Sequence, residues 1–464
     1  MMPAYRKARR LLYDHKVQDS FRPNRRSFLR HTATGIAAPF FVKNLISKPP
    51  SDTVHLASFG AGNMAFVTAR MLGAHPNVKI THIAEVDSAM LKEIKEPGQY
   101  QARFENAKIH EDWRRMLDKE HKNIDAVCVG TPDHMHAPQG MSAMQLGIPV
   151  YGQKPLAHDI YEVRKMTEMA RKKNLATQMG IQIHSHAAYK TAIQLVQSAA
   201  IGKIKEVHSW SEKKWGDMDP FPADRKDDVP STLNWDAWLG VCEPRPFVTD
   251  YYHTVNWRKR IDFGTATFGD MGCHIFDPVF GALALTAPLS IRSEGPAPSK
   301  QNWAINTIIH YVFPGTAFTE EKTINIHWYD GDERPPQEVQ ALVPNGILGQ
   351  GSIFIGTKGV MLLPHFKMPT LYPEAQFAGY DMPKIEGDNH YNQFIDAVMG
   401  NGKTSAPFEY AGPLTESVLL GPIATRFPHT TLEWNAAKLK FNNSPEATQY
   451  VRKQYRAGWK VKGL

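Results

Sequence analysis

Cysteine is scarce in this sequence of 464 residues, and the scarcity excludes two classes of small stabilised domain. The three cysteines, Cys128, Cys242 and Cys273, lie far apart and form no CxxC pair. This spacing excludes a zinc-finger motif and a disulfide framework. Long apolar runs are also missing, since none approaches the roughly 18 residues that a membrane-spanning helix needs. We therefore expect no stable membrane span.

An excess of positive or negative charge is missing from the chain after residue 50. Residues 1–50 hold 11 of the 54 Lys and Arg residues but only 2 of the 46 Asp and Glu residues. The rest of the chain is therefore close to neutral, which argues against a nucleic acid as partner. A chain of this length exceeds one ordinary hydrophobic core, so we expect two domains.

Residues 1–50 resemble a twin-arginine export signal followed by a linker. Arg25 and Arg26 precede Ser-Phe-Leu, and a weakly apolar stretch follows over residues 36–41. Such a signal is an address read by the twin-arginine export machinery, which we expect as a partner. We expect a periplasmic or otherwise exported protein. If the segment is a basic tail or a transit peptide instead, a cytoplasmic location is the alternative.

A glycine-rich turn between two expected strands predicts a dinucleotide site. An apolar run ends at Gly60, residues 64–72 have helical spacing, and residues 78–86 are strand-like. Gly60, Gly62 and Ala65 fill the small positions of G-x-G-x-x-G/A, which permit a tight turn, close approach of a pyrophosphate and helix packing. The predicted cofactor contacts in this turn are Gly60, Gly62, Asn63 and Met64.

An acidic residue at the end of the second strand indicates which cofactor binds. Glu85 lies 25 residues after Gly60. Its carboxylate would accept hydrogen bonds from a ribose diol and repel a 2′-phosphate, which favours NAD over NADP. Asp87 is a second candidate for the same role.

Strand-like and helix-like segments alternate up to about residue 180. Strands are expected over 125–132, 148–155 and 176–182, with helices over 136–147 and 160–174. This alternation predicts a doubly wound parallel sheet, whose ligands lie at the carboxyl ends of its strands. The residues at those ends that we predict to contact the cofactor are Thr131, Pro132, His134, His136, Gln153 and Lys154.

The second half of the chain is expected to contain another sheet. Residues 302–313, 323–329 and 351–363 alternate or run apolar as half-buried strands do, which fits an antiparallel sheet with one wet face. An aromatic-rich segment between residues 235 and 257 could pack in the core or form platforms for a sugar ring, and Trp257 is one candidate.

The stretch FGDMGCHIFD carries two acids and a histidine. In a regular helix Asp270, His274 and Asp277 would share one face. Metal ligation, proton transfer and structural hydrogen bonding all use such an arrangement, so the pattern alone leaves the three open.

Four stretches together resemble the Gfo/Idh/MocA oxidoreductase family. They are GAGNMA, TPDHMHAPQGMSAMQLGIPVYGQKPLA, AIGKIKEVHSW and NWRKRIDFGTATFGDMGCHIFD. The resemblance implies an α/β fold: an N-terminal Rossmann domain, expected at 51–180, and a C-terminal α/β domain with a large, open, mostly antiparallel sheet, expected at 181–464. It also implies a homo-oligomer, a dimer or a tetramer.

The resemblance assigns roles to particular residues. The family's E-K-P lysine falls on Lys154, although Gln153 replaces the usual glutamate, and its D-x-x-x-H pair falls on Asp270 and His274. This favours proton transfer over a metal site, and we expect no metal. The substrate contacts that it implies, with Trp257 from the aromatic segment, are Gln182, His184, Arg258, Asp270 and His274.

The resulting hypothesis is an NAD(P)-dependent oxidoreductase. It would transfer a hydride between a secondary hydroxyl of a sugar, polyol or glycoside and a nicotinamide cofactor, bound tightly because an exported protein meets no soluble cofactor pool. His274, with a pKa near its ordinary value, would be the acid/base, Asp270 would hold substrate or imidazolium, and Lys154 would polarise the reacting oxygen. The alternatives are an NAD-dependent glycosidase acting by transient oxidation, elimination and re-reduction, and a non-catalytic sugar-binding protein.

Overall fold

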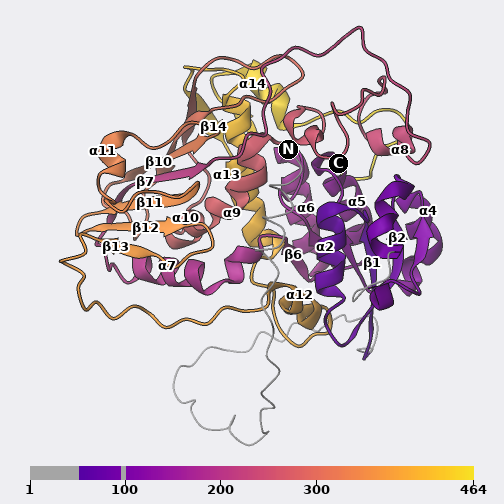
Figure 1. Ribbon diagram of the computed structural model, residues 1–464, viewed down its shortest axis with the longest axis horizontal. Coiled ribbons are helices and arrows are strands. Elements are labelled where there is room, and N and C mark those ends of the chain that lie inside the picture. The colour runs from indigo at the N-terminus through magenta and orange to yellow at the C-terminus, as the bar shows by residue number, and fades with distance from the viewer. Residues whose placement is uncertain (1–51, 96–100) are drawn as a thin grey trace, which may run out of the picture. The chain divides into compact units, whose positions relative to one another are not determined.

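The structure is a computed structural model that describes residues 52–95 and 101–464 (Figure 1). The expected export signal lies outside the described residues. In the part of the chain that is described, no helix is long and apolar enough to cross a membrane. Two β-sheets, one in each half of the chain, organise these residues.

The first sheet has six strands in the order β3-β2-β1-β4-β5-β6, and every neighbouring pair is parallel. Its strands are β1 (Val54–Phe59), β2 (Val78–Ala84), β3 (Lys108–His110), β4 (Ala126–Val129), β5 (Val150–Gly152) and β6 (Thr177–Met179). Its helices are α2 (Asn63–Leu72), α3 (Lys92–Lys95), α4 (Trp113–Glu120), α5 (His136–Gln145) and α6 (Ile160–Lys173). Short 3₁₀ turns are η1 (Ser88–Leu91), η2 (Gln101–Arg103), η3 (His121–Asn123) and η4 (Asp133–Met135). The predicted doubly wound parallel sheet is confirmed, with its reversal of strand order between β1 and β4.

The second sheet has nine strands in the order β13-β12-β11-β7-β10-β9-β8-β14-β15. All neighbouring pairs are antiparallel except β7–β10, which confirms the mostly antiparallel sheet. Its strands are β7 (Ile204–Ser211), β8 (Ser290–Glu294), β9 (Ile308–Pro314), β10 (Thr323–Asp330), β11 (Gln350–Gly356), β12 (Val360–Pro364), β13 (Thr370–Tyr372), β14 (Leu432–Asn435) and β15 (Lys440–Phe441). The α-helices after residue 181 are α7 (Ala187–Gln197), α8 (Trp235–Leu239), α9 (Cys273–Ile275), α10 (Asp277–Ala282), α11 (Gln337–Gln340), α12 (His390–Val398), α13 (Phe408–Ala424) and α14 (Pro445–Thr448). The short turns are η5 (Gln182–Ser185), η6 (Asn256–Lys259), the π-helical turn η7 (Phe268–Gly272) and η8 (Gln449–Val451).

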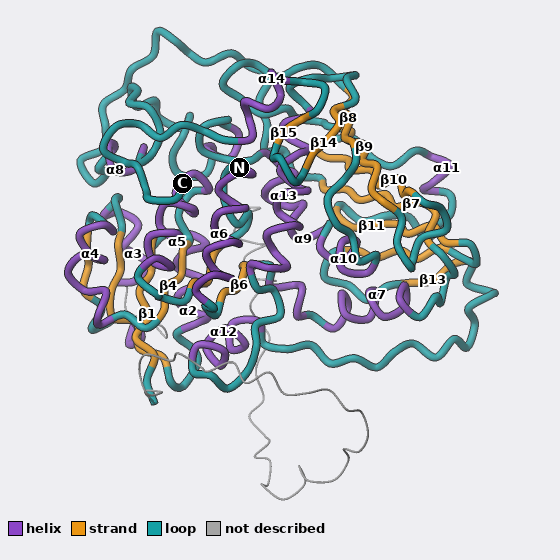
Figure 2. Tube along the Cα trace, turned by 180° about the vertical axis from the view of Figure 1, so that it is seen from behind, coloured by secondary structure: helices purple, strands orange, loops and turns teal. Residues whose placement is uncertain are grey.

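Helix α13 joins the two sheets through their hydrophobic core. It lies between them in both views and contacts α6 on one side and β8 on the other (Figures 1 and 2). The inner face of the second sheet presents Ile326 and Trp328, and Phe268 stacks on Trp328 with ring centroids 4.4 Å apart. This contact anchors the segment that carries Asp270 against the sheet.

Helix α12 belongs to the second half of the sequence but packs on the first sheet. Tyr391 stacks on Tyr151 of β5 at 5.7 Å between ring centroids, and Phe394 meets the same ring edge-on at 5.6 Å. The chain therefore returns to its first sheet after completing most of the second one.

Residues 268–277 do not form one regular helix. A π-helical turn over Phe268–Gly272 precedes α9, and α10 begins at Asp277. A π turn adds a residue to the turn, so offsets of four and seven residues no longer lie on one face. The expectation that Asp270, His274 and Asp277 share a face is therefore wrong.

Candidate active site

A cleft lies at the carboxyl ends of β1, β2, β4 and β5. Its volume is about 900 Å³, which includes the solvent-filled space at its opening. Its walls combine the glycine-rich turn, the ends of these strands and the aromatic segment near residue 257. The sequence-predicted site residues that line it are Gly60, Gly62, Asn63, Met64, Glu85, Thr131, Pro132, His136, Gln153, Lys154, Trp257 and Arg258.

The glycine-rich turn has the form that a dinucleotide phosphate requires. Gly60 has φ +94°, a left-handed conformation, and a Cβ there would lie 2.9 Å from the Cβ of Ala65. A Cβ on Gly62 would lie 2.6 Å from the sulfur of Met90. Helix α2 begins directly after Gly62, which caps it without a side chain and leaves its first N–H groups open to an anion. These residues therefore fit the pyrophosphate of a dinucleotide.

Glu85 is held beside this turn by the backbone. Its carboxylate accepts hydrogen bonds from the N–H groups of Ala61 at 2.7 Å and Asp87 at 2.9 Å. Burial raises the pKa of Glu85, and these two hydrogen bonds oppose the rise. The side chain lines the cleft and so lies where the sequence places a ribose contact.

Asp87 and His134, two predicted cofactor contacts, do not line the cleft. Asp87 is buried, caps the turn η1 through the N–H of Ala89, and pairs with His253 at 2.8 Å. His134 is fully buried, with Nε2 2.9 Å from the carbonyl oxygen of Trp238. Both side chains are occupied by structural partners, so the structure corrects their expected placement.

Lys154 lines the cleft and contacts Asp270, which is not itself among the lining residues. The ammonium nitrogen lies 2.5 Å from Asp270 Oδ1 and donates to the Asp270 carbonyl oxygen at 2.9 Å. Lys213 Nζ lies 3.3 Å from the other carboxylate oxygen, and Arg258 Nε lies 3.4 Å from Oδ1. Burial alone would raise the pKa of Asp270, but the three cations outweigh it and hold that pKa well below its usual range.

Sequence reasoning missed two residues of this cluster. Lys213 follows the end of β7, and burial lowers the pKa of its ammonium despite the charge of Asp270. Asp133, in the quoted TPDHMH stretch, lines the cleft and accepts a 2.7 Å hydrogen bond from Thr265. Burial raises the pKa of Asp133 to about 7. For Asp133, its position directly after an expected strand was the available signal, whereas the sequence offered none for Lys213.

His274 is buried and is not among the residues that line the cleft. Its Nδ1 has no hydrogen-bond partner in the described part of the chain, and its ring lies 5.9 Å from that of His365. Burial, with the charges of Lys154 and His365, lowers the pKa of His274 well below its ordinary value. The expectation of an ordinary pKa is therefore wrong, and the imidazole is neutral at neutral pH.

Of the remaining predicted substrate contacts, Trp257 lines the cleft, whereas Gln182 and His184 do not. Trp257 is buried, and the guanidinium of Arg258 lies 4.2 Å from the centroid of its ring. The amide nitrogen of Gln182 is buried without a partner among the described residues. Most aromatic residues of the 235–257 segment pack on one another, as Trp235 does on Trp238 at 4.9 Å, so core packing dominates there.

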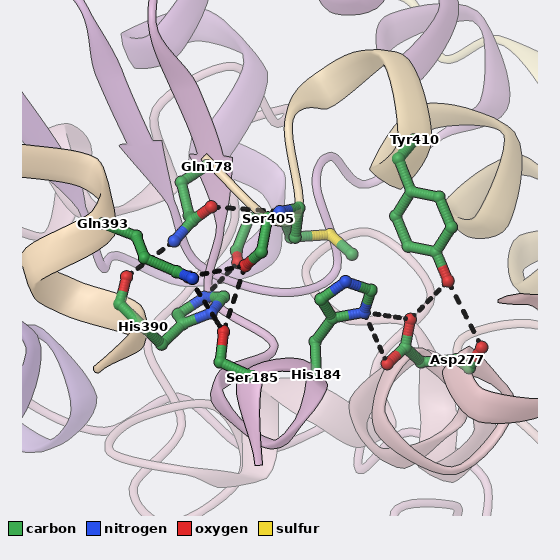
Figure 3. Close-up of polar contacts among 10 residues, drawn as sticks. Gln178, His184, Ser185, Asp277, His390, Gln393, Ser405 and Tyr410 are labelled. Carbon is green, nitrogen blue, oxygen red and sulfur yellow. Dashed lines mark hydrogen bonds and ion pairs between the residues drawn. The ribbon is translucent and has the colours of Figure 1, made fainter. Parts of the chain in front are cut away.

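Asp277 and His184 form a separate buried pair (Figure 3). Asp277 is fully buried, and its two carboxylate oxygens lie 2.9 and 3.0 Å from His184 Nδ1. Tyr410 donates its hydroxyl to the same carboxylate at 2.6 Å. Burial alone would lower the pKa of His184, but the negative charge of Asp277 outweighs it and raises that pKa. Asp277 thus makes structural hydrogen bonds and does not share a site with Asp270.

Replacing Asp277 with asparagine is expected to destabilise the fold by about 3 kcal/mol at pH 6. The raised pKa of His184 means that its contribution is fully present below pH 6.5 and is lost as pH rises through the folded-state value. Urea unfolding at pH 6 and pH 9 should therefore give a smaller difference at pH 9. Tyr410→Phe, the control, should cost about 1 kcal/mol at both pH values. An Asp277→Asn effect equal at the two pH values would contradict the ion pair.

Comparison with known families places the chain in an oxidoreductase family. Residues 54–181 match the family model described as the NAD-binding Rossmann fold of the GFO_IDH_MocA oxidoreductases, and residues 206–319 match their C-terminal alpha/beta domain. The two matches together cover more than half of the chain. The chain therefore belongs to the Gfo/Idh/MocA family of NAD-binding oxidoreductases, which confirms the resemblance found in the sequence.

Individual relatives share only part of their length with this chain. The dTDP-3,4-didehydro-2,6-dideoxy-alpha-D-glucose 3-reductase of Saccharopolyspora spinosa is 30% identical over 145 residues, 31% of this chain and 42% of that protein. A glycosyl hydrolase family 109 protein of Stenotrophomonas maltophilia is 29% identical over 140 residues, 28% of this chain and 29% of that protein. The matched region thus spans less than half the length of either relative.

A solved structure shares the fold over most of its length. The WlbA dehydrogenase of Chromobacterium violaceum, in complex with NADH and UDP-GlcNAcA, superposes with a TM-score of 0.58 at 15% sequence identity. The superposition covers 84% of this chain and 99% of that chain.

Proposed function

We propose that this protein transfers a hydride between tightly bound NAD and a secondary hydroxyl group of a sugar, polyol or glycoside. The observation that carries the proposal is the 2.5 Å contact between Lys154 and Asp270 in a cleft lined by the glycine-rich turn. This contact joins a cation that lines the cleft, just after β5, to an anion from the second half of the chain. The relatives named above that act on or bind sugar nucleotides support a carbohydrate substrate.

The side chains at this contact have the charges that alcohol oxidation needs. Bound NAD would supply the hydride acceptor. Lys154 would donate a hydrogen bond to the carbinol oxygen as negative charge develops there, so its stabilisation is largest in the transition state. Asp270, with its depressed pKa, would stay ionised and hold the ammonium in place.

The proton of the hydroxyl group would pass to a neutral base. His274 is neutral because burial and neighbouring cations lower its pKa, so one ring nitrogen is available as an acceptor. Because His274 does not line the cleft, the substrate would have to extend beyond the cleft lining to reach this nitrogen. Lys213 and Arg258, both in contact with Asp270, would keep that carboxylate in place while substrate occupies Lys154. The guanidinium of Arg258 rests on Trp257, which limits its motion.

One observation favours a second candidate, glycoside cleavage by transient oxidation, elimination and re-reduction. The Stenotrophomonas relative carries the name of a glycosyl hydrolase family. Incubation of the purified protein with NAD and a panel of sugars, sugar nucleotides and aryl glycosides separates the two. Reduced nicotinamide and a keto-sugar support the dehydrogenase, whereas released aglycone without net reduction supports the glycosidase. Binding without either product would support a sugar-binding protein.

We further propose that residues 1–50 direct export, which is why the cofactor would travel bound to the folded protein. The Arg25–Arg26 pair carries this proposal. Replacing both arginines with lysine should retain the protein in the cytoplasm on cell fractionation. Normal export of that double variant would contradict the signal.

Replacing Glu85 with glutamine should weaken NAD binding about 10-fold and narrow the preference for NAD over NADP. The reason is that a charged acceptor for the ribose diol, and a repulsive charge for a 2′-phosphate, are both removed. Titration calorimetry with both cofactors measures the change. Asp118→Asn, an exposed acid on α4, is the matched control and should bind NAD as the unmodified protein does. Unchanged selectivity in Glu85→Gln would place the ribose elsewhere.

A further inference from the structure

Three histidines lie side by side on the outer face of the second sheet. In the strand register His208 of β7 faces His327 of β10, which in turn faces His310 of β9. Glu206 precedes His208 by two residues on β7 and so points to the same face. The inner face presents the alternate residues, such as Val207 and Ile326, to the core. The histidine row therefore lies on the sheet face opposite the one that Phe268 packs against.

The carboxylate of Glu206 and two imidazoles converge on one point. Glu206 Oε1 lies 2.6 Å from His327 Nε2 and 3.3 Å from His208 Nε2. The three donor atoms all lie within 4.8 Å of one another. Among the described residues, this is the one group of three or more His, Cys, Asp and Glu side chains with donor atoms so close.

His208 holds an unsatisfied nitrogen aimed at this point. The residue is 3% exposed, and its Nε2 is buried without a well-directed hydrogen bond, although Glu206 is near. A buried polar atom without a partner costs free energy, which a ligand would recover. The opposite nitrogen of the ring, Nδ1, lies 3.0 Å from the hydroxyl oxygen of Tyr329.

The second imidazole is oriented in the same way. His327 turns Nε2 towards Glu206, while its Nδ1 lies 2.6 Å from Nδ1 of His310. Fixing one ring nitrogen by a polar neighbour is how proteins orient the other nitrogen of a metal-binding histidine. Both candidate ligands therefore have an outer partner already in place.

We propose that Glu206, His208 and His327 bind a divalent transition-metal ion such as Zn²⁺. Two neutral imidazoles and one carboxylate form a donor set that zinc commonly uses, with a fourth position left for water. Metal–ligand distances near 2.1 Å place tetrahedral donors roughly 3.4 Å apart, so the observed separations need only small side-chain movements. The donor set carries one negative charge, which suits a dication.

The ion would connect β7 and β10, the parallel pair in an otherwise antiparallel sheet. Its place on the outer face separates it from the cleft, so it would stabilise the sheet and take no part in hydride transfer. This role differs from a metal at Asp270, His274 and Asp277, whose side chains point to different partners.

Calorimetric titration of the chelator-treated full chain with zinc chloride tests the proposal. We expect one ion per chain and a melting temperature that rises with zinc concentration. Glu206→Gln and His327→Gln should each weaken zinc binding about 100-fold or more, since loss of even an outer partner costs 10–100-fold. His429→Gln, an exposed histidine paired with Glu294, should bind zinc normally.

Two results would overturn the metal site. One is absence of zinc binding to a chain whose circular dichroism is native; the other is unchanged binding in both ligand variants. Because Glu206 and His327 are only partly buried, both variants should fold, and their melting curves without zinc verify this. Activity in the cleft should be the same with and without zinc.

Discussion

Replacing Lys154 with methionine should lower the rate of hydride transfer about 100-fold or more while NAD stays bound. The ammonium is the positive group in the cleft wall that the proposed mechanism directs at the carbinol oxygen. Its removal should not unfold the protein, because Asp270 keeps its contacts with Lys213 and Arg258. The measurement is the single-turnover rate of NAD reduction, with cofactor content determined by mass spectrometry.

Lys205→Met is the matched control for this experiment. Lys205 is half-exposed and lies 4.0 Å from Glu320 on the second sheet, so its loss should leave the rate unchanged. If Lys154→Met retains a rate within a few-fold of the unmodified protein while binding NAD, Lys154 does not stabilise the reacting oxygen. The proposed mechanism would then fail at its main electrostatic step.

Replacing His274 with glutamine should also reduce turnover, by about 100-fold or more. A base works only when unprotonated, and the folded-state pKa of His274 is lowered below 6.5. The unmodified enzyme should therefore keep this base fully active at neutral pH and lose it only as the pH falls through the lowered pKa. The pH profile of kcat/KM for the two proteins measures both effects.

The variant Asp133→Asn is the control that distinguishes the ionisation of Asp133 from that of His274 in the pH profile. The pKa of Asp133, raised to about 7 by burial, would produce a change near neutral pH that Asp133→Asn should remove. A loss of activity near pH 6.5 that persists in Asp133→Asn and disappears in His274→Gln would mean that the histidine titrates at its ordinary value. That outcome would contradict the buried, neutral imidazole.

Local patterns in the sequence predicted the strands and helices around the glycine-rich turn and several strands of the second sheet. The turn at Gly60 and Gly62 and the apolar runs around it correspond to β1, α2 and β2 within a few residues. The alternation in TINIHWY corresponds to β10, with Ile324 and Ile326 buried. The large, mostly antiparallel sheet was expected from the family resemblance, because strand periodicity does not say which strands pair. The parallel β7–β10 pair and the packing of α12 on the first sheet are contacts between segments far apart in the sequence, which local patterns do not predict.

The sequence predicted those parts of the candidate site whose functional side chains directly follow a strand. Lys154 was placed in the cleft from its position after β5, and the glycine-rich turn from its motif. Lys213 was missed because nothing near it in the sequence indicates that it meets Asp270, 57 residues away. The sequence did not predict which residues of 268–277 share a face, because a π-helical turn has no distinct periodicity in so short a segment.

Two electrostatic features could come only from the packed structure. The lowered pKa of His274 depends on burial and on Lys154 and His365, which are distant in the sequence. Asp277 is a structural residue because its carboxylate contacts His184 and accepts a hydrogen bond from Tyr410. Sequence offsets alone could not separate it from Asp270.

The central claim is that a sugar carbinol is oxidised by bound NAD against the Lys154–Asp270 pair. The most direct test is to mix the NAD-loaded protein with a panel of sugars and sugar nucleotides deuterated at their carbinol carbons, and to analyse the nicotinamide by mass spectrometry. The account predicts deuterium on the reduced cofactor with at least one sugar, and little or none in Lys154→Met. Reduced cofactor without deuterium, or no reduced cofactor with any sugar in the panel, would contradict it.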